Sequence, residues 1–101
     1  MEKFYSKVNT YGVGIEPMER TGRVVETDSN LFGIYKNEYN DYDIIDLNTG
    51  LSVNYLNYYR LKDIKANIDK YDEKLNSIKQ SPSYKQLCDE WIDLLNKNKT
   101  S

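Results

Sequence analysis

The chain has 101 residues, of which 39% are apolar and 30% charged, and its formal net charge is −2. This length and composition are typical of one small globular domain and exclude a disordered chain. Histidine is absent and Cys88 is the single cysteine, which excludes Ser-His-Asp and Cys-His triads, histidine-based zinc sites and all-thiolate zinc sites.

The start of the chain, MEKFYSKVNTYG, has neither the apolar core nor the small-residue cleavage site of a signal peptide. No apolar run reaches the length that spans a bilayer. A lone cysteine cannot form an intrachain disulfide, which fits a reducing compartment. We therefore expect a cytoplasmic protein with no membrane partner.

Residues 1–56 are predicted to form short strands separated by turns. The expected strands are Lys3–Val8, Tyr11–Glu16, Gly22–Thr27, Leu31–Lys36, Tyr42–Leu47 and Leu51–Leu56. These segments are rich in aromatic and β-branched residues, and Pro17 is expected to end the second of them. Asn48-Thr49-Gly50 is the clearest hairpin signal, because glycine stands at the left-handed position of a three-residue loop. Five or six short strands predict a bent antiparallel sheet, and over residues 11–56 their spacing resembles an SH3-like barrel.

Residues 57–97 are predicted to form a two-helix hairpin, which makes the whole chain a single α+β domain. Apolar residues recur at steps of three and four from Leu61 to Ile78, along one helix face. Ser81-Pro82 should end this helix and begin the next, which carries a broader apolar stripe from Tyr84 to Leu95. The first stripe could also close a homodimer as a coiled coil, but a matching helix after a short connection favours packing within a monomer. Residues 98–101 are expected to form a frayed tail.

The most distinctive segment runs from Glu38 to Tyr59, with four acids, no base and five tyrosines. Tyrosine offers a large rigid contact area with a polar tip, and neighbouring acids favour a basic partner. Tyr39 lies in a polar turn over residues 37–41, whereas Tyr42, Tyr55 and Tyr58 could instead pack between sheet and helices. The predicted partner-binding residues are Glu38, Tyr39, Asp41, Tyr42, Asp43 and Asp46.

Other site chemistry is weakly represented, so we expect no enzyme activity, cofactor or metal. Asp41, Asp43 and Asp46 lack the glycine and the terminal glutamate of an EF-hand loop. Paired carboxylates for glycoside hydrolysis need a cleft with fixed separation, which a domain of this size rarely offers. Gly12 and Gly14 match only part of a dinucleotide fingerprint and more simply mark a bend or bulge in a strand. Cys88 lies on the apolar stripe and is interpreted as a small buried hydrophobe.

Nucleic-acid binding is the alternative function. Residues 60–101 carry nine bases and seven acids, and the bases of the first predicted helix alternate with acids. Such fields largely cancel beyond a Debye length, so direct nucleic-acid binding is disfavoured.

The chain resembles, in length, composition and lack of catalytic residues, the small orphan proteins encoded by phages and plasmids of AT-rich bacteria. Its abundant lysine, asparagine, isoleucine and tyrosine have AT-rich codons. This resemblance implies a protein that binds and inhibits a host defence or regulatory protein, as anti-CRISPR proteins do. The expected function is therefore a non-enzymatic protein-binding module that presents an acidic, tyrosine-rich surface to a basic host protein.

Overall fold

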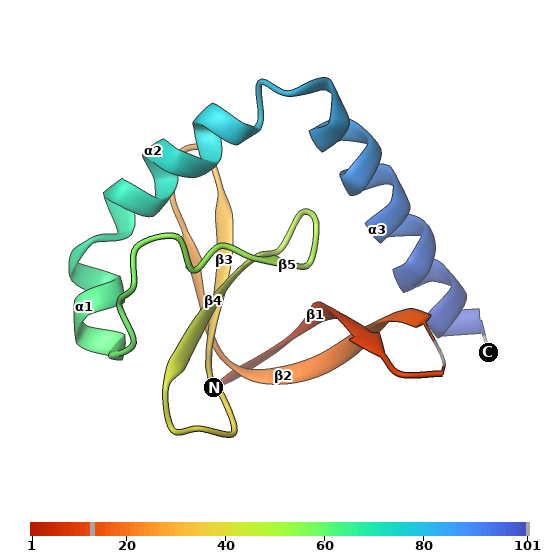
Figure 1. Ribbon diagram of the computed structural model, residues 1–101, viewed down its shortest axis with the longest axis horizontal. Coiled ribbons are helices and arrows are strands. Elements are labelled where there is room, and N and C mark those ends of the chain that lie inside the picture. The colour runs from red at the N-terminus through yellow and green to blue at the C-terminus, as the bar shows by residue number, and fades with distance from the viewer. Residues whose placement is uncertain (13, 101) are drawn as a thin grey trace.

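A computed structural model describes residues 1–12 and 14–100, with side chains described as far as residue 97. Over these residues the chain is α+β, with an antiparallel sheet followed by helices (Figure 1). The strands are β1 (Glu2–Thr10), β2 (Gly14–Glu26), β3 (Leu31–Lys36), β4 (Tyr42–Asp46) and β5 (Leu51–Ser52). The helices are α1 (Leu61–Ala66), α2 (Ile68–Ile78) and α3 (Pro82–Thr100). The predicted fold class is confirmed.

The described strands follow one another in space in chain order, each antiparallel to the next. The sheet curls into a half-barrel, because the Lys7 N–H donates to the Gly50 carbonyl at 2.7 Å and joins β1 to the turn between β4 and β5. At Gly22, β2 pairs with both β1 and β3. A Cβ atom there would lie 2.0 Å from the Ile34 carbonyl oxygen, so the close approach requires glycine.

Strand β2 is continuous, whereas the sequence predicted two strands separated at Pro17. Pro17 pairs with Lys7 of β1, and β3 joins β2 only from Gly22 onward. At Pro17 the strand therefore has a neighbouring strand on one side only. Proline is tolerated at such an edge position, because its missing N–H need not break a hydrogen bond between strands.

The predicted strand Tyr11–Glu16 is wrong at Tyr11 and Gly12, which lie in the turn that joins β1 to β2, and its residue 13 lies outside the described residues. Thr10 pairs with Gly14 across this turn. Gly12 and Gly14 have φ values of 83° and 96°, in the left-handed region that glycine favours. The two glycines thus make a hairpin turn rather than a bend within a strand.

Strand β5 is also shorter than the predicted Leu51–Leu56. The Val53 N–H still donates to the Ile44 carbonyl at 2.8 Å, but the Ile44 N–H donates to the Asn54 side-chain oxygen at 2.9 Å. A side chain replaces the backbone acceptor here, so the ladder ends and the chain turns away towards α1.

The core has two parts, one on each face of the sheet. On the helix side, Phe32, Ile34 and Ile44 pack with buried residues of the helices, among them Ile64, Tyr71, Leu75 and Tyr84. On the other face, Phe4, Tyr35 and Ile45 form a smaller cluster inside the curl. Gly33 makes room for the Phe4 ring, because a Cβ atom there would lie 2.5 Å from it.

The middle of the first helical stripe is buried within the chain, with Ile64, Tyr71 and Leu75 each at most 1% exposed, whereas Ile78 at its end is 38% exposed. The predicted helix is broken at Asn67, whose φ of −117° and ψ of 22° separate α1 from α2. The Asn67 amide donates to the Asp63 carbonyl at 2.8 Å and so satisfies a carbonyl at the end of α1.

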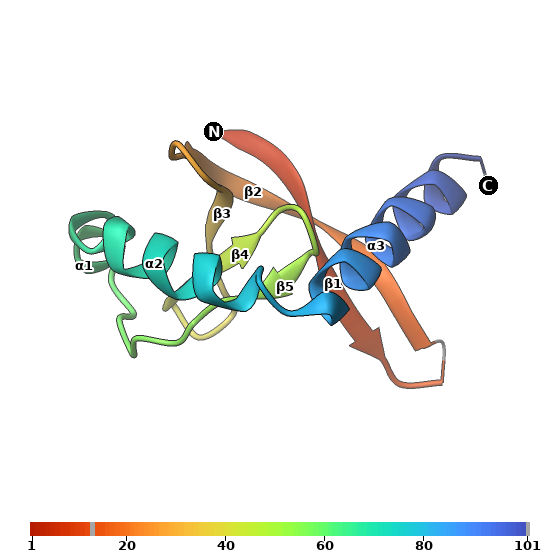
Figure 2. The same cartoon turned by 90° about the horizontal axis from the view of Figure 1, so that it is seen from above.

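Helices α2 and α3 diverge from their short connection instead of lying side by side as a closed hairpin (Figures 1 and 2). Helix α3 packs on the turn between β4 and β5, where the Trp91 Nε1–H donates to the Leu47 carbonyl at 3.2 Å. Gly50, with φ of 72°, lies so close to the Trp91 ring that a Cβ atom would approach it to 2.7 Å. The predicted frayed tail is helical as far as Thr100, and Ser101 lies outside the described residues.

Candidate protein-binding surface

The turn between β3 and β4 is held by the side chain of Asn37. Its oxygen accepts the N–H of Tyr39 at 2.9 Å and the N–H of Asp41 at 3.1 Å. The Asn37 N–H donates to the Asp41 carbonyl at 2.7 Å, and Asn40 takes the left-handed conformation with φ of 67°. Asparagine suits both positions, because its side chain mimics a backbone acceptor and it tolerates positive φ. The backbone of the turn at Tyr39 is thus held by several hydrogen bonds.

Tyr39 is exposed at the tip of this turn, at 77%. Glu38 and Asp41 beside it are also exposed. Within the part of the chain that the structure describes, neither carboxylate makes a hydrogen bond or an ion pair. An accessible aromatic ring is therefore flanked by two available negative charges.

A hollow of about 340 Å³ adjoins the turn and continues onto β2. It is lined by Met18, Arg20, Tyr35, Asn37, Glu38, Tyr39 and Asp43. The Arg20 guanidinium lies 4.5 Å from the centroid of the Tyr35 ring, and its Nε–H donates to the Ser6 hydroxyl at 2.9 Å. The positive charge in the hollow is thus held by the Tyr35 ring and the Ser6 hydroxyl.

Asp43 also lines the hollow, as the cross-strand partner of Tyr35, and is half-buried. One of its oxygens accepts the side-chain amides of Asn37 at 3.2 Å and Asn54 at 2.9 Å. Burial raises the pKa of Tyr35, Arg20 lowers it, and the charge and hydrogen bond of Asp43 raise it further. Asp43 therefore holds the side chains of Asn37 and Asn54 in place and also adds negative charge to the hollow.

Two of the predicted partner-binding residues lie elsewhere. Tyr42 is half-buried and packs against the helix-side core. Asp46 is 1% exposed, so its inclusion in an exposed acidic surface is wrong. Its Oδ2 atom accepts the hydroxyls of Thr49 at 3.1 Å and Tyr84 at 2.5 Å, which buries the carboxylate between the β4–β5 turn and α3.

The burial predicted for the other side chains is confirmed for some of them and not for others. Of the tyrosines that could pack between sheet and helices, Tyr58 does pack against the helix-side core, whereas Tyr55 is 45% exposed. Cys88 is half-buried against that core, and burial raises the pKa of its thiol, as expected of a packing residue. Sequence reasoning did not find Met18 and Arg20, because only the bend of β2 brings them beside the β3–β4 turn.

No protein-family model matches the chain, and neither the curated proteins nor the solved structures contain a match. Among the described residues, no helix is both long and apolar enough to cross a membrane. The functional proposal therefore depends on the geometry described above.

Proposed function

We propose that the protein is a non-enzymatic protein-binding module. Its contact surface, which we call the Tyr39 surface, consists of Met18, Glu38, Tyr39, Asp41 and Asp43. The observation that carries the proposal is the 77% exposure of Tyr39 at the tip of a turn fixed by Asn37. An ordered turn loses little conformational freedom on binding, and tyrosine contributes large contact area at low entropic cost.

The charge arrangement favours a partner with lysine or arginine at its surface. Glu38 and Asp41 carry available carboxylates beside the exposed ring of Tyr39. A basic side chain can lay its aliphatic stem against such a ring while its head meets the carboxylates. Arg20 lines the same hollow but is already held by the Ser6 hydroxyl and the Tyr35 ring.

We extend the proposal to an inhibitor of a host defence or nucleic-acid-processing protein. Proteins that bind nucleic acids use basic surfaces that contact phosphates. An acidic turn that occupies such a surface would compete with the nucleic acid for it. This extension also follows the resemblance to the small proteins of phages and plasmids.

The test is affinity capture of partners from the native host with wild-type protein and variants of the Tyr39 surface. We expect Tyr39→Ala and the double variant Glu38→Lys/Asp41→Lys to reduce recovery of the specific partner by roughly tenfold. Tyr11→Ala is the matched control, because Tyr11 is fully exposed on the distant β1–β2 turn. Equal recovery by wild type and by folded Tyr39 and Glu38/Asp41 variants would disprove the proposal.

A further inference from the structure

The hollow beside the β3–β4 turn lies on the face of the sheet that carries the smaller core cluster. Residues directly opposite one another in an antiparallel pair share a face, and so do alternate residues of one strand. Asp43 pairs with Tyr35, which belongs to that cluster, and Tyr35 also pairs with Gly22. Met18 and Arg20 precede Gly22 at steps of two, so they lie on the same face. The rest of the lining comes from the turn itself.

The charges that line the hollow leave one negative charge unbalanced. Glu38 and Asp43 are acidic, and Arg20 is the single base of the lining. Arg20 is already engaged, since its Nε–H donates to the Ser6 hydroxyl and its guanidinium lies over the Tyr35 ring. The Glu38 carboxylate makes no hydrogen bond or ion pair among the described residues. An entering cation is therefore favoured over an entering anion.

The apolar part of the lining suits the stem of a long side chain. Met18 is 41% exposed and Tyr39 is 77% exposed, so both present apolar surface to an entering group. The volume of about 340 Å³ is small for a ligand pocket, since such pockets hold roughly 300–1,000 Å³. Lysine and arginine pack their aliphatic stems on apolar surface while the charged head stays among polar groups. The hollow has room for one such side chain.

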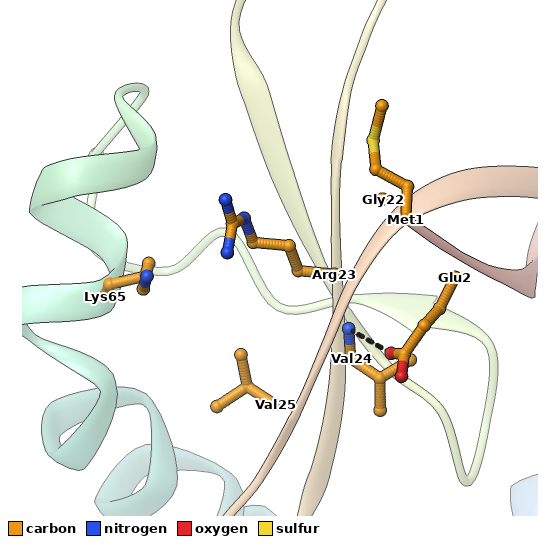
Figure 3. Close-up of a pocket in the computed structure, with 7 residues that line it drawn as sticks. All are labelled: Met1, Glu2, Gly22, Arg23, Val24, Val25 and Lys65. Atoms are coloured by element: carbon orange, nitrogen blue, oxygen red, sulfur yellow. Dashed lines mark hydrogen bonds between the residues drawn. The ribbon is translucent and has the colours of Figure 1, made fainter.

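A second hollow, of about 500 Å³ between β2 and α1, lacks this convergence of groups (Figure 3). Arg23 extends towards α1, which carries Lys65. The Glu2 carboxylate is bonded to the Val24 N–H at 3.0 Å, on the other side of β2 (Figure 3). Its charged groups thus belong to separate surfaces, and no single side chain would meet them together.

We propose that the hollow beside the β3–β4 turn binds one lysine or arginine side chain of the partner protein. The stem would lie against Met18 and the Tyr39 ring, and the charged head would meet the carboxylates of Glu38 and Asp43. Because the inserted side chain belongs to the partner of the Tyr39 surface, this role rests on the proposed function. It makes one inserted side chain, rather than a diffuse attraction between two surfaces, the main contact of the complex.

NMR titration of isotope-labelled protein with capped amino acids tests this binding in the absence of the partner. N-acetyl-lysine methylamide and N-acetyl-arginine methylamide should each give saturable shifts of the backbone amides of residues 37–43. The stronger of the two responses identifies the side chain. The norleucine analogue has the lysine stem without the charge, so it should bind roughly fivefold more weakly or less. The glutamate analogue should not bind.

Two substitutions remove the charge without removing the side chain. Glu38→Gln should weaken binding of the lysine analogue roughly fivefold, and it changes a side chain that makes no bond in the described chain. Asp43→Asn should have a similar effect, while its remaining oxygen can still accept the amides of Asn37 and Asn54. Glu26→Gln is the matched control, since Glu26 is exposed on β2 but does not line the hollow.

Three results would overturn the proposal: no saturable shift with either cationic analogue, equal binding of the norleucine analogue, or preferred binding of the glutamate analogue. The last result would assign the hollow to Arg20. Any of them, together with loss of partner capture by the Tyr39 and Glu38/Asp41 variants, leaves protein binding standing and removes only the inserted side chain. Saturable binding of the lysine analogue with unchanged partner capture would instead keep the cation-binding hollow and disprove the proposed function.

Discussion

Several donors converge on the buried carboxylate of Asp46. The hydroxyls of Thr49 and Tyr84 donate to one oxygen, and the Asn48 N–H donates to the other at 3.1 Å. A buried carboxylate is tolerated only where such donors replace water. Because Tyr84 belongs to α3, its hydrogen bond to Asp46 links this helix to the β4–β5 turn.

The Tyr84 hydroxyl is therefore expected to contribute to stability. Tyr84→Phe leaves the buried Asp46 carboxylate with one donor fewer and should lower the free energy of unfolding by about 1–3 kcal/mol. Urea unfolding followed by the fluorescence of Trp91 measures this change, because Trp91 is 2% exposed and should report the loss of packing.

Tyr71→Phe is the matched control for this prediction. Tyr71 is 1% exposed, and its hydroxyl has no hydrogen-bond partner among the described residues. Removing an unsatisfied buried hydroxyl should leave the free energy of unfolding unchanged or raise it. Equal destabilisation by the two substitutions would show that loss of the hydroxyl itself, rather than of the bond to Asp46, is responsible.

At the scale of elements, a polar cluster fixes α2 against the β2–β3 turn. The Asn30 amide nitrogen donates to the side chains of Asp72 and Asn76, and its oxygen accepts Lys79 Nζ at 2.8 Å. The Thr27 hydroxyl also donates to Asp72, at 2.7 Å. Apolar packing holds α2 on the sheet without choosing a direction, whereas these directional bonds align it with the turn.

Asn30→Ala removes the centre of this cluster. Asn30 is 5% exposed, so its loss leaves several polar groups unpaired and should lower the free energy of unfolding by about 1–3 kcal/mol. Hydrogen exchange should accelerate more in α2 than in β3 and β4. Asp28→Ala in the same turn should change neither quantity, because Asp28 is exposed. Uniform acceleration across the chain would contradict a local role for Asn30.

At the scale of the whole molecule, the features predicted from sequence are those that local chemistry determines. Strand Leu31–Lys36 and the left-handed Gly50 of the β4–β5 turn follow from residues inside each segment, although that turn begins at Leu47 and has four residues where three were predicted. The continuity of β2 through Pro17, the break at Asn67 and the divergence of α2 from α3 depend on what packs against them. Local patterns carry no information about those neighbours.

The same distinction applies to the candidate site. The exposure of Tyr39 could be predicted, because polar turn residues surround it. The burial of Asp46 could not, since it requires Tyr84 from another element, 38 residues away in the chain. Arg20 reaches the hollow only through the curl of the sheet, which sequence alone does not show.

Four tyrosines, of which all but Tyr55 are buried, give the whole molecule a defined response to alkaline pH. Burial raises the pKa of Tyr35, Tyr55, Tyr71 and Tyr84, and the effect is greatest at Tyr84, where Asp46 adds to it. Tyrosines of the unfolded chain ionise at about pH 10, whereas these four tyrosines stay protonated to higher pH in the folded chain. Their contribution to stability is therefore complete below about pH 10 and is lost as the pH rises towards their folded pKa values.

Urea unfolding at increasing pH should show the free energy of unfolding falling above about pH 10, and Tyr84→Phe should make the fall shallower. Identical slopes for wild type and Tyr84→Phe would mean that Tyr84 ionises equally in both states.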